Sequence, residues 1–197
     1  KKAIEVDPGY VDAHYNLAIT FNDLGQFTNA IDYYEKTIAL NPNFAAAHNN
    51  LGNVLNGLGR NKYAIQSFEE AIRINPNFAE AFSNLGNVYK ELNKFNSAVS
   101  SYQKAIKIKP NFIEAYNNLG ILFDEHGQLD FAVEIYEKLL LINPNFAESH
   151  KNLGFIFLKL GKFKAAKSSF ISALNIKPDY AEVHKHLGYL LKKNKQM

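Results

Sequence analysis

The prolines of the chain recur every 34 residues, and this spacing limits what the chain can fold into. They are Pro8, Pro42, Pro76, Pro110, Pro144 and Pro178. Each interval holds two stretches in which apolar residues recur at i, i+3, i+4 and i+7, a pattern typical of an amphipathic α-helix. A single hairpin of two such helices cannot bury its own apolar faces. The period therefore predicts an all-α solenoid of stacked helix–turn–helix repeats.

We expect one domain, residues 1–197, because no linker or low-complexity stretch interrupts the period. Residues 1–6 match the end of a second helix, so the chain is expected to be a piece of a longer array. Five full repeats and the first helix of a sixth follow, at 7–40, 41–74, 75–108, 109–142, 143–176 and 177–197.

Small and polar residues recur at fixed places within each repeat. The turn between helices carries residues that tolerate the left-handed conformation, Gly25, Gly59, Asn93, Gly127 and Gly161. Glycines inside the first helices predict close helix contact, with alanines of the second helices as small counterparts; they are Gly52, Gly86, Gly120, Gly154 and Gly188, and Ala30, Ala64, Ala98, Ala132 and Ala166. In four repeats, an Asn or Asp after the proline and a Glu three residues later predict a capping box, as at Asn77 and Glu80.

These residues resemble the signature of the tetratricopeptide repeat family. The third full repeat supplies Phe82, Leu85, Gly86, Tyr89, Ala98, Tyr102 and Ala105, and Pro110 follows it. The resemblance covers essentially the whole chain. It implies a right-handed superhelix in which first helices line a concave inner face and second helices lie outside.

A row of asparagines on the first helices forms the main candidate binding site. Asn16, Asn50, Asn84, Asn118 and Asn152 recur every 34 residues, and His186 ends the row. An amide carries both donors and an acceptor, so a regular row could hold the backbone of an extended peptide. The row resembles the asparagine ladder of the repeat arrays in O-linked N-acetylglucosamine transferase and kinesin light chain. The alternative is that each asparagine bonds the neighbouring repeat and holds the stack together.

Further residues on the first helices extend the predicted peptide-binding surface. Asn53 and Asn87 add amides near the middle of the chain. Towards its end we expect lysines beside exposed apolar side chains, namely Lys151, Phe155, Leu158, Lys185 and Tyr189. Lys159, Lys192 and Lys193 add positive charge there, opposite acidic residues earlier in the chain. Such a gradient would orient a charged peptide.

The composition offers no sign of catalysis or of a bound cofactor. The chain has no cysteine, no glycine-rich phosphate loop and no nucleophile set beside a base, so we expect neither an enzyme nor a cofactor or metal site. A net charge of only +3 does not indicate nucleic-acid binding, and no apolar run is long enough to cross a membrane. Cytoplasmic location is our expectation, although the lack of cysteine leaves the redox compartment open.

The leading hypothesis is a scaffold that binds an extended peptide segment of another protein in its concave groove. Two alternatives stay open. The chain could be the substrate-recruiting arm of a larger enzyme such as a glycosyltransferase, or a structural array that associates with itself end to end.

Overall fold

The helices expected from the apolar periodicity are present in the computed structural model, which describes residues 2–193. These residues form helices and no strand, so the all-α class is confirmed. The helices are α1 Lys2–Val6, α2 Val11–Asp23, α3 Phe27–Leu40, α4 Ala45–Gly57, α5 Asn61–Ile74, α6 Ala79–Glu91, α7 Phe95–Ile108, α8 Ile113–Glu125, α9 Leu129–Ile142, α10 Ala147–Lys159, α11 Phe163–Ile176 and α12 Ala181–Lys193.

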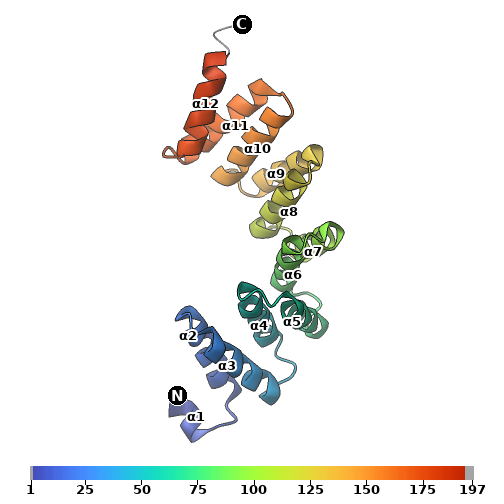
Figure 1. Ribbon diagram of the computed structural model, residues 1–197, viewed down its shortest axis with the longest axis vertical. Coiled ribbons are helices and arrows are strands. Elements are labelled where there is room, and N and C mark those ends of the chain that lie inside the picture. The colour runs from blue at the N-terminus through green and yellow to red at the C-terminus, as the bar shows by residue number, and fades with distance from the viewer. Residues whose placement is uncertain (1, 194–197) are drawn as a thin grey trace. The chain divides into compact units, whose positions relative to one another are not determined.

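The chain divides into two compact units, which we call unit 1 (residues 1–109) and unit 2 (residues 110–197). Unit 1 holds α1 to α7, with hairpins α2–α3, α4–α5 and α6–α7 following one another (Figure 1). Unit 2 holds hairpins α8–α9 and α10–α11, followed by α12. The single continuous array expected from the sequence stays a prediction.

Four of the hairpins, from α4–α5 to α10–α11, are closed by a ring of the second helix that lies against a glycine of the first. A Cβ built on Gly52 or Gly86 would come within 2.7 Å of the ring of Phe68 or Tyr102, and one on Gly154 within 2.4 Å of the ring of Phe170. Such distances leave no room for a methyl group. The predicted close contact is therefore present, but the group that the glycine meets first is an aromatic ring rather than the expected alanine.

The turns have the predicted left-handed residues. The four turn glycines have φ between +69° and +71°, and Asn93 has a φ of +55°. Asparagine is one of the few residues with a side chain that adopt this conformation readily. The sequence therefore predicted these turns correctly.

The predicted capping box is wrong, because the first helices begin one residue later than it requires. In the second to fifth repeats, the residue before the helix is a phenylalanine, and it makes no side-chain cap. The loop is fixed further back, where Oδ1 of Asn75 accepts a hydrogen bond of 3.1 Å from the backbone N–H of Asn77. The phenylalanine at the cap position packs against the preceding first helix instead of capping, since the ring of Phe44 lies 4.7 Å from that of Tyr15.

Histidines tie four of these loops to the helices that follow them. In His14, His48, His150 and His184, the ring atom Nε2 lies 2.7–3.1 Å from the carbonyl oxygen of the proline six residues earlier. A carbonyl only accepts, so Nε2 carries the proton. The repeated spacing of six residues from proline to histidine is the signal that could have revealed this hydrogen bond.

Candidate functional site

The asparagine row of unit 1 lies on α2, α4 and α6, and each later member reaches back to the preceding first helix. Nδ2 of Asn50 donates a hydrogen bond of 2.9 Å to the hydroxyl of Tyr15. Nδ2 of Asn84 donates one of 3.0 Å to Oδ1 of Asn49. Both partners stand 35 residues earlier in the chain, so the row connects consecutive repeats.

A further bond makes these contacts into one network. Nδ2 of Asn49 donates to Oδ1 of Asn50 at 3.2 Å. Tyr15, Asn50, Asn49 and Asn84 are thus joined through three hydrogen bonds across α2, α4 and α6. The structural role that the sequence left as an alternative is therefore present in unit 1.

The network does not use the full capacity of the row. Asn16 is exposed, and its side chain forms no hydrogen bond within residues 2–193. In the same part of the chain, Oδ1 of Asn84 accepts no hydrogen bond, and its amide nitrogen donates one of the two bonds it can make. Hydrogen-bond donors and acceptors that the network does not use thus remain on the half-exposed side of the row.

The tyrosines beside the row stay neutral hydroxyls at ordinary pH. Burial raises the pKa of Tyr15, although the hydrogen bond from Asn50 opposes this. Burial also raises the pKa of Tyr34 to about 12, with a smaller contribution from nearby Tyr15. These hydroxyls can therefore both donate and accept.

A small pocket of about 150 Å³ opens beside the row in unit 1. Asn50 and Asn53 line it together with Ile19, Asn22 and Tyr34. Asn53 is exposed. The other amide predicted for this surface, Asn87, has its Oδ1 bonded by the hydroxyl of Tyr102 at 2.7 Å, which links α6 to α7.

In unit 2 the row makes a different contact. Nδ2 of Asn152, on α10, donates a hydrogen bond of 2.9 Å to the hydroxyl of Tyr136 on α9. Tyr136 is buried, and burial raises its pKa well above the ordinary value. Asn118, on α8, is half-buried. Asn152 thus braces a first helix against the second helix of the repeat before it.

The predicted lysine anchor of unit 2 is held by its own repeat and the next. Lys151 pairs with Glu148, and its Nζ lies 5.4 Å from the ring centre of Tyr180. The hydroxyl of Tyr180 donates to the same carboxylate. Burial alone raises the pKa of Glu148, but the bonds from Lys151 and Tyr180 outweigh it and lower the pKa. Lys151 therefore acts as a structural contact between α10 and the loop before α12.

The predicted apolar anchors of unit 2 differ in exposure. Phe155 packs its ring 5.1 Å from that of Phe170 and 4.8 Å from that of His186, and it joins the core together with Leu158. The expectation that these two side chains are freely exposed is wrong, because α12 covers them. Tyr189 is 63% exposed, and Lys185 is exposed as well.

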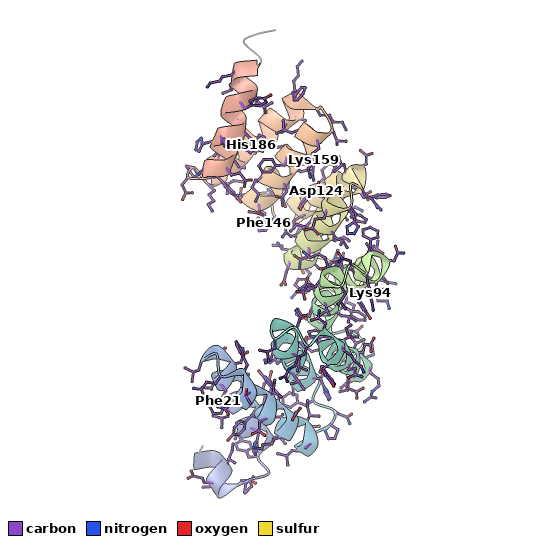
Figure 2. All side chains as sticks on the ribbon, viewed as in Figure 1. Phe21, Lys94, Asp124, Phe146, Lys159 and His186 are labelled. Atoms are coloured by element: carbon purple, nitrogen blue, oxygen red, sulfur yellow. The ribbon has the colours of Figure 1, made fainter. Side chains whose placement is uncertain are left out.

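One residue of the predicted charge gradient is neutralised inside unit 2. Nζ of Lys159 lies 2.6 Å from Oδ1 of Asp124, and Figure 2 labels both residues. Lys192 is exposed, and the side chain of Lys193 lies outside the described residues. Within residues 2–193 no three His, Cys, Asp or Glu side chains are grouped so as to hold a metal ion. No helix in that range is long and apolar enough to cross a membrane.

Comparison with protein-family models decides the family. Models described as tetratricopeptide repeat match residues 11–44, 33–66, 113–146 and 147–180, and one described as TPR repeat matches residues 56–93 and 86–127. The chain belongs to the tetratricopeptide repeat family. The predicted family and the α-solenoid class are thereby confirmed.

Solved structures of tetratricopeptide repeat proteins have the same fold. The crystal structure of MamA is 26% identical over 87% of this chain and 94% of that one, with a TM-score of 0.76. PilF of Pseudomonas aeruginosa is 23% identical over 95% and 86%, with a TM-score of 0.79. YrrB, described as a TPR protein with an unusual peptide-binding site, is 24% identical over 100% and 97%, with a TM-score of 0.71. A comparison with curated proteins gives no match.

Proposed function

We propose that this tetratricopeptide array is a non-catalytic scaffold that binds an extended segment of another protein along its asparagine row. The observation that carries the proposal is the unused hydrogen-bonding capacity of a regularly spaced row, at Asn16 and at Oδ1 of Asn84. YrrB, whose fold this chain shares, is described as having a peptide-binding site. The small pocket beside Asn50 and Asn53 gives the same surface a recess for a side chain.

The spacing of the row suits a peptide backbone. Packed helices lie about 8–10 Å apart, and an extended chain rises about 3.3 Å per residue. An asparagine would then meet the peptide roughly every third residue. A guest held in this way is recognised mainly through its main chain, because an amide can pair with both N–H and C=O.

A peptide-array screen with the 197-residue chain would supply the binding sequence, and a backbone-modified copy of that peptide tests the mechanism. N-methylation of alternate residues removes main-chain N–H donors and keeps every side chain. We expect this copy to bind at least tenfold more weakly. Equal affinity of the two peptides would rule out recognition by the asparagine row.

The matched protein variants are Asn16→Ala and Asn53→Ala, because both residues are exposed and neither forms a side-chain hydrogen bond within the described part of the chain. Each should weaken peptide binding without changing the melting temperature. Self-association and recruitment to an enzyme domain outside this chain stay predictions. Light scattering over a concentration series tests self-association, and the full reading frame tests recruitment to an enzyme domain.

A further inference from the structure

An open pocket of about 590 Å³ lies in unit 1 between the second helices α3 and α5, above the first helix α4. Its floor is apolar and includes Ile31, Leu51 and Leu55. The volume falls in the range of ligand-binding pockets in proteins. Asn50 and Asn53 do not line this pocket, which is therefore separate from the asparagine row.

The same groove recurs one repeat later, between α5 and α7 and above α6, with a volume of about 490 Å³. Leu85 stands there in the place of Leu51, and Glu69 in the place of Glu35. Two charges differ, since Lys104 replaces Glu70 and no residue in the place of Arg60 lines the second groove. The second groove is thus a natural control, alike in shape and different in charge.

The groove above α4 is open because a serine replaces a tyrosine. In the first hairpin, Tyr33 lays its ring 5.8 Å from that of His14 and 5.3 Å from that of Phe21 (Figure 2 labels Phe21). Thirty-four residues later the position is Ser67, which lines the pocket. A hydroxymethyl group leaves vacant the space that the tyrosine ring fills one repeat earlier.

Opposite charges stand at the two ends of this apolar floor. Arg60 lies beside Tyr63 where α5 begins, and Glu70 lies near its end, with Glu35 on the facing helix. A helix rises 1.5 Å per residue, so Arg60 and Glu70 are about 15 Å apart along the groove. Within residues 2–193, Arg60 and Glu35 form no ion pair, whereas Glu70 pairs with Arg73 at 2.6 Å. The groove can therefore recognise both the apolar face and the direction of a guest.

We propose that the groove between α3 and α5 binds a short amphipathic helix of a partner protein, with apolar side chains on Leu51 and Leu55. A basic residue of the guest would meet Glu35 and Glu70, and an acidic residue would meet Arg60. A guest of about ten residues spans the distance between these charges. Helices bound in grooves are typically held by anchors at i, i+3, i+4 and i+7, which an apolar floor of this length accommodates.

The test uses a fluorescein-labelled 14-residue peptide with leucines at i, i+3, i+4 and i+7, glutamates in its first turn and lysines in its last. Its partner peptide has glutamine at every charged position. We expect the charged peptide to bind at least tenfold more tightly, and increasing salt to remove the difference. Equal binding of the two peptides, or no binding of either, would overturn the proposal.

The protein variants locate the site. Ser67→Tyr copies the residue that fills this position in the first hairpin, so it should abolish binding, while Ser101→Tyr fills the second groove and should change the affinity less than twofold. Circular dichroism checks that both variants fold. If Ser67→Tyr does not fold, the double variant Glu35→Lys with Glu70→Lys, which we call the rim variant, tests the site instead. It leaves the core unchanged and should weaken binding at least tenfold.

Equal effects of the two serine variants, or an unchanged affinity of the rim variant, would refute the site. So would amide shifts of bound ¹⁵N-labelled protein centred on Asn50 and Asn53 rather than on Ile31 and Leu51. That last result would place the peptide on the asparagine row and leave the proposed function standing.

Discussion

The contact between glycine and ring inside four of the hairpins can be tested with two alanines at equivalent positions. Gly154 and Gly188 occupy the same place in consecutive repeats, both inside first helices of unit 2. A Cβ on Gly154 would lie 2.4 Å from the ring of Phe170. A Cβ on Gly188 would meet no described atom within 4 Å. The same substitution is therefore expected to have opposite effects.

The magnitudes follow from helix propensity and packing. Alanine is more favourable than glycine in a helix interior by about 1 kcal/mol, so Gly188→Ala should raise the free energy of unfolding by up to that amount. Gly154→Ala gains the same term, but its methyl group must push the ring of Phe170 away by roughly 1 Å. Overpacking of this kind costs about 1–3 kcal/mol, which leaves a net loss of up to about 2 kcal/mol.

Thermal melts followed by circular dichroism would measure the difference. For a chain of this length, 1 kcal/mol corresponds to roughly 2–4 °C, so Gly154→Ala should melt up to about 8 °C below the wild type. Adding Phe170→Leu to Gly154→Ala should restore part of the loss, because the smaller side chain relieves the clash. If both alanine variants shift the melting temperature equally, or if Phe170→Leu gives no rescue, the ring contact is not what requires glycine.

Three further predictions concern unit stability. His14→Phe removes the N–H that reaches the carbonyl of Pro8, and urea unfolding should show a loss of about 1 kcal/mol. The lowered pKa of Glu148 means that its ion pair stabilises the fold above the pKa of the unfolded carboxyl, and that this stability is lost as the pH falls through the lower folded value. The melting temperature of Glu148→Gln should therefore fall less between about pH 5 and 3 than that of the wild type. Asn50→Ala should lower the melting temperature, whereas Asn16→Ala should leave it unchanged, because only Asn50 bonds a neighbouring repeat.

The helices, hairpins and turns could be predicted because they depend on residues close together in the chain. A glycine at position 25 and an asparagine at position 93 are enough to indicate a left-handed turn, and the structure has both. The start of the first helices was harder to predict. In the sequence, Asn75 and Asn77 look equally suited to capping the helix. The structure shows that neither caps it, and that Asn75 instead accepts a hydrogen bond from the backbone of Asn77, in the loop before α6.

The hydrogen bonds of the asparagine row could not be predicted in detail, because the row alone does not determine its partners. The period of 34 places Asn50 and Asn84 on one face, but the partner is the residue just before the row in the preceding repeat. That position is Tyr15 for Asn50 and Asn49 for Asn84, and Lys151 occupies it in a later repeat. The asparagine is the same in each of these repeats, but the residue before it varies and provides the partner of the bond between first helices. A search for residues that recur every 34 positions does not detect such a partner.

The bracing bonds and the proposed peptide contacts do not exclude each other, because asparagine has more hydrogen-bonding groups than the brace uses. Asn84 gives one N–H to Asn49 and keeps a second N–H and its oxygen for a guest. An alanine at position 84 would remove both roles together, so a loss of binding there would not show which role mattered. Asn16 has no bracing bond, and a change in the peptide backbone leaves the protein intact. These two perturbations separate binding from stacking, and a scaffold that binds through its row should respond to both without any change in its melting temperature.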